Sequence, residues 1–423
     1  MNKTAAAGQG QPARESNINA IVSYFESGIK AFGGPGELGI ELEQIIVHDD
    51  MSPVSYSGEH GVAWVLRQLE ADYPRTTTDE HGDLLGVARP SEAVTIEPAA
   101  QIELSAGPFA DLATARDTFE GFAQRLSDVL EPAGEKALAI GYHPSATARS
   151  LELIPKRRYQ FMNLYLGAKS SFGPCMMRGS ASTQVSIDYS SVPDCLRKLR
   201  LAFALVPLFS LMCNNSPVFE GKPRSHEFVR TEIWRHCDPD RCGLVPDVMD
   251  PSFDLRRYAA FLLDAPAILV PCKKEQWCYS ERTFGDIYAQ RTMTRAEVEH
   301  AASMFFTDVR LKTYIEIRPA DALPIPYVIG YAALVKGLFY DAGNLDALDA
   351  LFSDVRGADV EAAKDALMES GYGARVYGRP VADLADCMIR LARGGLDEEE
   401  RPYLDPLAKL VAARETLAGR AER

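Results

Sequence analysis

The chain has 423 residues, and its 45 Lys and Arg residues against 59 Asp and Glu residues give a formal net charge of −14. This acidic balance argues against a nucleic-acid partner or an anionic membrane surface. The composition is that of a globular protein with enough apolar residues for a large core. The N-terminal stretch lacks the apolar segment of a secretory signal. Residues 1–16 are therefore predicted to be a disordered leader, followed by a single domain over 17–423.

Hydrophobic periodicity predicts, in chain order, strands over 39–47 and 93–105, a helix over 113–131, a strand over 182–188, helices over 196–214 and 295–309, a strand over 314–318 and a helical region from 327 to 420. Strands and helices do not alternate regularly, which favours an α+β fold with an antiparallel or mixed sheet. The longest charge-free apolar run, 201–213, contains Pro207 and is too short to span a bilayer. A buried helix is expected there.

Each predicted strand has one aliphatic face and one acidic or amide face. Side chains two positions apart share a face of a strand, so Glu41 and Glu43 lie side by side, opposite Ile40 and Leu42. The other polar faces carry Glu97 before Pro98, Gln101 with Glu103, Gln184 with Asp188, and Glu316 with Arg318. A sheet with one face in water is the simplest interpretation of each strand taken singly.

Taken together, the polar faces are more acidic than a solvated face usually is. Like charges that oppose each other on a sheet are destabilising, so we expect cations among them. Carboxylate oxygens are preferred ligands of hard ions such as Mg²⁺ or Mn²⁺. Because Mg²⁺ usually completes its coordination with waters and phosphate oxygens, the face is predicted to bind a metal–ATP complex.

The eight cysteines are scattered through a chain without an export signal. Reduced thiols and a cytoplasmic location are therefore expected. The spacings of Cys237 with Cys242 and of Cys272 with Cys278 match no common zinc template, which leaves a zinc site as the less favoured alternative. His143 precedes a proline and is interpreted as a turn or packing residue rather than a general base.

Six segments carry further motifs in a fixed order: GIELEQ, VTIEPAAQIELSAGP, IPKRRYQFM, MMRGSASTQVSIDYSS, NNSPVFEGKPRSHEFVRTEIWRHCDPDRCGLVP and VRLKTYIEIRPAD. In these segments the chain resembles the glutamate–cysteine ligases of plant and proteobacterial type. The chain departs from the motifs of this family at two places, which bear on the pathway and on the second substrate. Arg178 lies one position earlier than the arginine of many members, and Thr231 and Glu232 replace smaller polar residues beside Arg230.

The resemblance implies a curved, mainly antiparallel sheet of the glutamine synthetase/guanido kinase type, with an acidic active-site face, helices on the other face and a helical C-terminal part. It implies ATP-dependent ligation of the glutamate γ-carboxylate to the amine of cysteine through a γ-glutamyl phosphate, as in the first step of glutathione or related thiol synthesis. The expected partners are glutamate, cysteine and ATP, with no nucleic acid or membrane, in a monomer or homodimer. A γ-glutamyl ligase for another amine and an inactive ATP-binding regulatory homologue are the alternatives.

The resemblance also implies a role for each candidate site residue. Arg318 is expected to stabilise the transferring phosphoryl group or to pair with Glu316. Arg230, with its planar guanidinium, is expected to bind a substrate carboxylate. The predicted metal ligands are Glu41, Glu43, Glu97, Glu103, Gln184 and Glu316; the predicted catalytic residues are Arg318, Glu316 and Arg230; and the predicted substrate-binding residues are Arg230, Arg158, Arg241, Trp234 and Tyr159.

Overall fold

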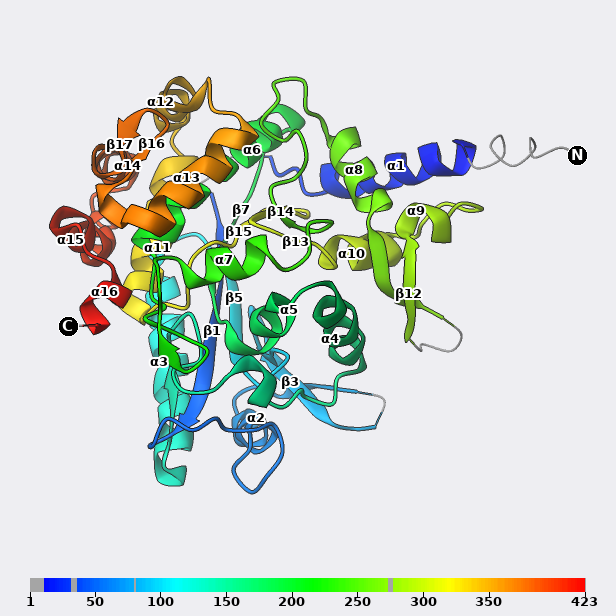
Figure 1. Ribbon diagram of the computed structural model, residues 1–423, viewed down its shortest axis with the longest axis vertical. Coiled ribbons are helices and arrows are strands. Elements are labelled where there is room, and N and C mark those ends of the chain that lie inside the picture. The colour runs from blue at the N-terminus through cyan, green and yellow to red at the C-terminus, as the bar shows by residue number, and fades with distance from the viewer. Residues whose placement is uncertain (1–10, 32–35, 80, 273–276, 423) are drawn as a thin grey trace, which may run out of the picture.

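A computed structural model describes residues 11–31, 36–79, 81–272 and 277–422. A nine-stranded sheet lies at its centre, and all of its strand pairs are antiparallel (Figure 1). The strand order is β14–β15–β7–β1–β5–β4–β3–β2, with β6 also paired to β1. These strands are β1 (Leu38–His48), β2 (Arg75–Thr78), β3 (Leu84–Arg89), β4 (Glu92–Ile96), β5 (Ile102–Phe109), β6 (Glu135–Leu138), β7 (Thr183–Ile187), β14 (Val309–Leu311) and β15 (Ile315–Ile317).

Helices surround the sheet and form most of the C-terminal region. They are α1 (Gln11–Glu26), α2 (Val62–Leu69), α3 (Leu112–Leu130), α4 (Arg157–Lys169), α5 (Phe172–Pro174), α6 (Val192–Met212), α7 (Val229–Arg235), α8 (Leu255–Asp264), α9 (Phe284–Ile287), α10 (Arg295–Ser303), α11 (Ile325–Phe339), α12 (Ala342–Phe352), α13 (Gly357–Ser370), α14 (Val381–Gly395), α15 (Asp405–Ala413) and α16 (Leu417–Ala421). No helix among the described residues is long and apolar enough to cross a membrane. The C-terminal helices, yellow to red, gather on one side of the molecule, away from α1 (Figure 1).

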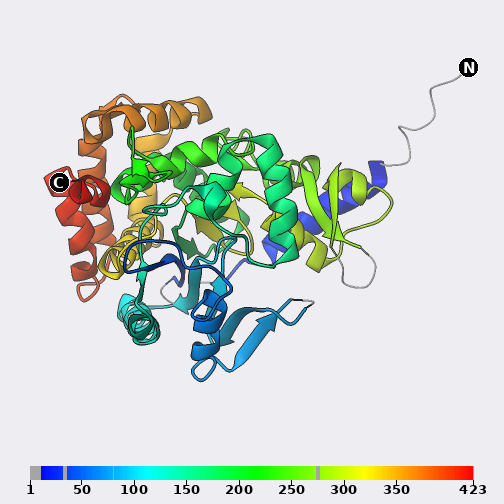
Figure 2. The ribbon, with the colours of Figure 1, turned by 60° about the horizontal axis from the view of Figure 1, so that its bottom comes forward.

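Short two-stranded pairs complete the structure: β8 (Val218–Phe219) with β9 (Lys222–Pro223), β10 (Cys242–Gly243) with β13 (Phe306–Thr307), β11 (Pro266–Pro271) with β12 (Trp277–Thr283), and β16 (Arg375–Val376) with β17 (Arg379–Pro380). The β2–β3 hairpin, in blue, extends from the body of the molecule in the second view (Figure 2).

The strand register confirms the predicted division into two faces. Glu43 on β1 lies directly opposite Glu103 on β5, and Glu41 lies opposite Gln184 on β7. Glu316 on β15 lies opposite Ser186 on β7 and therefore belongs to the same face. The aliphatic side chains of the other face are buried, and α3, α6 and α11 contact the sheet. The polar face is thus held in place by a hydrophobic layer behind it.

Three predicted boundaries need correction. The predicted strand 93–105 is two strands, because a turn at Glu97 joins β4 to β5; the backbone N–H of Glu97 donates to the Gln101 carbonyl at 2.8 Å. The predicted helix 295–309 ends at Ser303, and the chain beyond it enters β13 and β14. Residues 11–16 of the predicted leader belong to α1, where Arg14 pairs with Asp264 at 2.9 Å. Residues 1–10 lie outside the described part of the chain.

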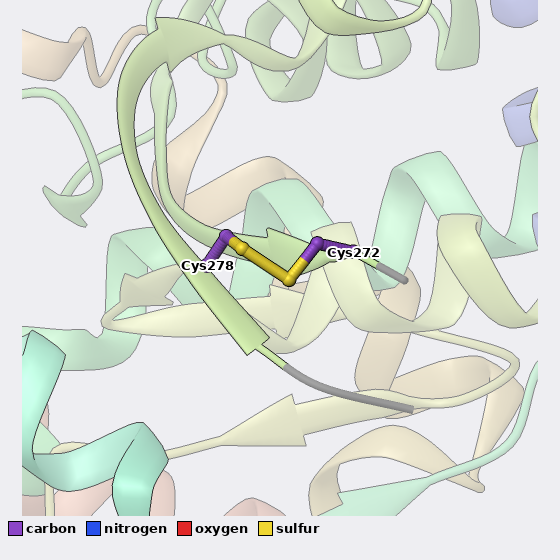
Figure 3. Close-up of a disulfide and its surroundings, with 2 residues drawn as sticks. All are labelled: Cys272 and Cys278. Carbon is purple, nitrogen blue, oxygen red and sulfur yellow. A yellow bond between two sulfur atoms is a disulfide. The ribbon is translucent and has the colours of Figure 1, made fainter. Parts of the chain in front are cut away.

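The expectation of reduced thiols is wrong for one pair of cysteines. Antiparallel pairing of β11 with β12 brings the Cα atoms of Cys272 and Cys278 within 5.8 Å, and a disulfide joins them (Figure 3). This separation lies in the normal range for a disulfide. The other six cysteines are free, and five of them are buried.

Candidate active site

A cavity of about 930 Å³ opens on the polar face of the sheet. Residues of β1, β5 and β7 contribute to its lining, and α4, α7 and β12 contribute further side chains. Of the predicted site residues, the structure places these in the lining: Glu41, Glu43, Glu97, Glu103, Arg158, Tyr159, Gln184, Arg230, Trp234 and Arg318. Glu316 and Arg241 lie outside it.

Four carboxylates face one another in this cavity, with too little positive charge between them to offset their repulsion. Burial, followed by neighbouring carboxylates, raises the pKa of Glu41 and of Glu103 to about 8 and that of Glu97 to about 7. Burial also raises the pKa of Glu43, although the nearby Arg230 acts in the opposite direction. The surroundings therefore raise the pKa of each of these carboxyls above its ordinary value, and a bound cation would favour their ionised forms.

Hydrogen bonds from the neighbouring strands orient two of these carboxylates. Glu43 accepts from the backbone N–H of Ser182 at 2.7 Å and from its hydroxyl at 2.8 Å. Glu103 accepts from the hydroxyls of Thr95 at 3.0 Å and Ser105 at 2.9 Å. Ser182 could not be singled out by periodicity or motif, because its role depends on how the loop before β7 meets β1.

Glu316 is fully buried beneath the cavity wall and pairs with three basic side chains. Its carboxylate pairs with Arg310 at 2.7 Å, Lys312 at 3.1 Å and Arg318 at 2.8 Å. These cations hold the pKa of Glu316 well below its usual range despite its burial. Glu316 as a metal ligand stays a prediction; in this structure its oxygens pair with these three basic side chains, and the residue positions them in the cavity lining.

Arg318 connects this cationic group to the acidic one. Its Nη1 donates to the side-chain oxygen of Gln184 at 2.5 Å, and the Gln184 amide in turn donates to Glu43 at 3.3 Å. The guanidinium also lies 5.9 Å from the ring centre of Trp234. Pairing with Glu316 and a position on the cavity wall are thus compatible, so the two roles proposed for Arg318 do not exclude each other.

Arg230 is buried at the start of α7, where its side chain lines the cavity. Its Nη1 donates to the Ala320 carbonyl at 2.8 Å and lies 3.5 Å from the carboxylate of Asp321. Asp321 is itself fixed by the backbone N–H of Asn215 at 2.7 Å. The buried Nε of Arg230 has no partner among the described residues. One edge of the guanidinium is thus anchored, and the side chain forms part of the cavity wall.

Arg241 does not contribute to the cavity, which corrects its prediction as a substrate-binding residue. The side chain is fully buried and pairs with Asp238 at 2.6 Å. It also donates to the carbonyls of Met304 at 3.0 Å and Pro266 at 2.7 Å. Its role is to fasten α7 and the following loop to β11 and α10. The RCG segment of the motif could not distinguish this role from ligand binding.

The first turn of α4 forms a basic wall opposite the sheet. Arg158 donates to the Ser303 carbonyl at 3.0 Å, and the Tyr159 hydroxyl lies 3.4 Å from Glu97. Lys156, which the sequence analysis did not select, also lines the cavity, with its ammonium 4.5 Å from the ring centre of Tyr159. The run of three basic residues in IPKRRYQFM was the available indication.

His143 is confirmed as a turn residue. Its Nδ1 accepts from the backbone N–H of Ala146 at 3.1 Å, and burial lowers its pKa to about 4. The zinc alternative finds no support, because Cys272 is in the disulfide with Cys278 while Cys237 and Cys242 are free. In the described ranges, no three His, Cys, Asp or Glu side chains lie close enough together to hold an ion by themselves.

A large pocket lined by convergent charged groups on a rigid sheet is typical of an enzyme that acts on small polar substrates. The family model described as "Glutamate-cysteine ligase family 2(GCS2)" matches residues 37–420. The chain belongs to this family of ligases.

Curated relatives agree with this assignment over most of their length. The chain is 29% identical to glutamate–cysteine ligase B of rice, covering 90% of this chain and 78% of the relative. It is 29% identical to the glutamate–cysteine ligase of Medicago truncatula, covering 95% and 80%. The solved glutamate–cysteine ligase of Francisella tularensis, described in complex with AMP, has a TM-score of 0.59 at 11% identity, covering 92% of this chain and 84% of that one. This last likeness concerns the fold.

Proposed function

We propose that the protein joins the γ-carboxylate of glutamate to the amine of cysteine at the expense of ATP, giving γ-glutamylcysteine, ADP and phosphate. The observation that carries this proposal is the set of four facing carboxylates, with Arg230 near Glu43 and Lys312 near Glu41. With a divalent cation at the carboxylates, such a cavity would suit two anionic substrates whose charges must be brought together. The family and the names of the relatives support the same reaction.

The donor set fits a divalent cation, Mg²⁺ or Mn²⁺. The Glu41 carboxyl group makes no side-chain hydrogen bond among the described residues, and its pKa is raised to about 8 by burial and by the nearby acids Glu316 and Glu103. Glu97, Glu103 and Glu43 complete the set, with Gln184 as a neutral ligand. Because no three of the described groups enclose an ion by themselves, waters and ATP phosphates are expected to supply the remaining ligands. Such an ion neutralises phosphate charge during transfer.

Activation of the carboxylate explains the need for ATP. An oxygen of the glutamate γ-carboxylate attacks the γ-phosphorus, the bond to the β-phosphate oxygen breaks, and ADP leaves. The amine then attacks the acyl carbon, and phosphate departs with the oxygen that came from glutamate. Phosphoryl transfer depends mainly on positioning and charge stabilisation, which Arg318, Arg310 and Lys312 can provide at the cavity wall. Carboxylates and the departing phosphate are available to take the proton of the amine.

The finer fold class and the location are part of this proposal. A continuous antiparallel sheet with its active face opposite a helical layer supports the glutamine synthetase/guanido kinase type. The six free cysteines favour a cytoplasmic location.

Isotope transfer tests the proposed function directly. With glutamate carrying ¹⁸O in its side-chain carboxylate, one label is expected in the released phosphate for each peptide bond formed. Mass spectrometry of phosphate and of γ-glutamylcysteine gives the ratio. Cysteine is to be compared with other amines and with none. Label-free phosphate, or AMP and pyrophosphate as products, would contradict the acyl-phosphate route, and equal turnover with another amine would favour the wider γ-glutamyl ligase.

The pKa values predict a link between pH and cation binding. Because Glu41 and Glu103 have pKa values of about 8 in the folded chain and ordinary values near 4.3 when unfolded, the folded state binds more protons between these limits. The stability of the metal-free protein should therefore fall as pH rises from about 5 to 8. Cation binding must displace these protons, so apparent Mg²⁺ affinity should rise by about tenfold per pH unit for each proton released.

Thermal melting in chelator and in saturating Mg²⁺, at pH 6 and pH 8, measures this effect. The stabilisation by Mg²⁺ should be larger at pH 8. An equal stabilisation at both pH values would show that these carboxyls do not bind the ion.

The proposed contact between Arg230 and a carboxylate of glutamate predicts a change in the KM of glutamate. Arg230→Lys keeps the charge and loses the planar guanidinium, so a carboxylate loses one of its hydrogen bonds. A loss of about 2 kcal/mol, the lower end for a buried charged pair, raises the glutamate KM about 30-fold. Steady-state kinetics with each substrate varied in turn measures it. Arg235→Lys is the matched control, because Arg235 lies on the same helix and pairs at the surface with Glu361 at 3.1 Å.

A further inference from the structure

A buried ion pair connects the C-terminal helices to the chain segment before β14. Lys364, on α13, is 1% exposed. Its ammonium lies 2.7 Å from the carboxylate of Asp308 and 2.7 Å from that of Glu361. The Asp308 side chain is 13% exposed and that of Glu361 is 36% exposed, so Asp308 is the partner that depends more on Lys364. Burial lowers the pKa of Lys364, but the two carboxylates outweigh burial and leave it above its ordinary value.

The backbone of Asp308 is hydrogen-bonded to the backbone of Arg318. Asp308 lies between β13 and β14, and its carbonyl accepts from the N–H of Arg318 at 3.0 Å. This bond extends the pairing of β14 with β15 by one residue beyond the pair of Val309 with Ile317. On its other side, the N–H of Asp308 donates to the Gly243 carbonyl at 3.0 Å. The place of the Arg318 backbone therefore depends on that of Asp308.

The side chain of Asp308 also lies near the basic groups of the active site. A small pocket next to the main cavity is lined by Asp308 together with Arg230, Trp234 and Arg318, and the last three line the main cavity as well. Among the described residues, Lys364 is the only ion-pair partner of the Asp308 carboxylate. A largely buried carboxylate that loses its partner is strongly destabilised, so it would turn toward another cation or toward water. Either movement displaces the backbone to which Arg318 is bonded.

We propose that Lys364 is a positioning residue for the ligation reaction, which it supports by neutralising Asp308 and so holding Arg318 in place. The proposal rests on the proposed role of Arg318 in phosphoryl transfer. Lys364 does not line the main cavity, and its effect passes through Asp308 and the backbone of Arg318. The helical region beyond residue 327 thereby takes part in the reaction, although the motifs of the sequence end at Asp321.

Lys364→Met removes the charge and keeps a long side chain. The kcat should fall about 10–100-fold, because a small displacement of a reacting group can cost this much. The KM of glutamate should change little, since Arg230 keeps its own anchors at the Ala320 carbonyl and Asp321. Lys364→Arg keeps the charge and should restore most of the kcat. Lys364→Gln is the milder variant, which also lacks the charge but can still donate a hydrogen bond to Asp308, and its kcat should fall too.

Removal of the unpaired carboxylate distinguishes positioning from a purely structural role. In the double variant Lys364→Met with Asp308→Asn, the kcat should recover toward that of Asp308→Asn alone. Each kcat is measured well below the melting temperature of the variant, so that loss of folded protein does not lower the rate. Glu361→Gln is the matched control, because it removes the more exposed carboxylate of the same lysine and leaves the pair with Asp308 intact.

Three results would overturn the positioning role: a wild-type kcat in the uncharged variants of Lys364, an equal fall in Glu361→Gln, or no recovery in the double variant. A rise in the KM of glutamate without a fall in kcat would do so as well. A wild-type kcat in Arg318→Gln would instead overturn the proposed role of Arg318, so the two failures can be told apart.

Discussion

Replacing Arg318 with glutamine is expected to lower kcat by about 10²–10³-fold, the usual cost of removing one preorganised donor from a transition state. Arg318 lines the cavity and bridges Glu316 at 2.8 Å and Gln184 at 2.5 Å. These contacts hold the guanidinium in position before the substrates arrive. It therefore need not reorganise as charge moves onto the transferred phosphoryl group. The KM of glutamate should change little, because Arg230 makes the expected contact with that substrate.

The fold should survive this substitution, since Glu316 keeps Arg310 at 2.7 Å and Lys312 at 3.1 Å. Thermal melting and steady-state kinetics separate the two effects. Arg256→Gln is the control, because Arg256 pairs with Glu15 on the surface and does not line the cavity. A kcat within threefold of the wild-type value would remove Arg318 from the reaction and leave it a structural partner of Glu316.

Replacing Glu41 with glutamine should separate activity from stability. The change removes one charge from the predicted metal site without breaking a hydrogen bond among the described residues, so kcat should fall about 10²–10³-fold, as for other preorganised charges, and more Mg²⁺ should be needed for half-maximal rate. Ionised Glu41 is disfavoured by burial and by the nearby acids Glu316 and Glu103. The metal-free variant should therefore melt at a higher temperature than the wild type at pH 8.

A fall in kcat together with a rise in melting temperature distinguishes a functional acid from a structural one. Glu120→Gln is the control, on the exposed surface of α3. Full activity of the Glu41 variant at wild-type Mg²⁺ concentrations would remove this carboxylate from the metal site. A lower melting temperature at pH 8 would show that its charge stabilises the fold.

The face that carries the acids could be predicted from the sequence because the pleat of a strand fixes it. Period two placed Glu41, Glu43, Glu103, Gln184 and Glu316 on one face, and the register confirms that placement. Period two does not show which face residues remain accessible. Glu316 is on the predicted face and yet fully buried, because Arg310 from the neighbouring strand and Lys312 close over it.

Pairing between distant segments could not be predicted from the sequence either, because periodicity does not show which segments meet. The pattern that suggested a helix over 295–309 is equally consistent with a helix followed by short strands, and the pairing of Phe306 with Cys242 decides between them. Arg241 sits in a motif, and no pattern shows that Asp238 and two carbonyls use its donors. The β2–β3 hairpin, with Arg75 and Thr77, lacked any strong alternation and was missed.

The strand order has a consequence for how the chain is made. β1, β5 and β7 leave the ribosome long before β15, which pairs with the free edge of β7, and before α11, which packs on β1 and β7. Until about residue 339 has been synthesised, the nascent sheet therefore has an open edge and an uncovered aliphatic face. Such edges and faces recruit other chains. We expect the growing polypeptide to depend on chaperones during this interval, and the release of a finished molecule to wait for its last helices.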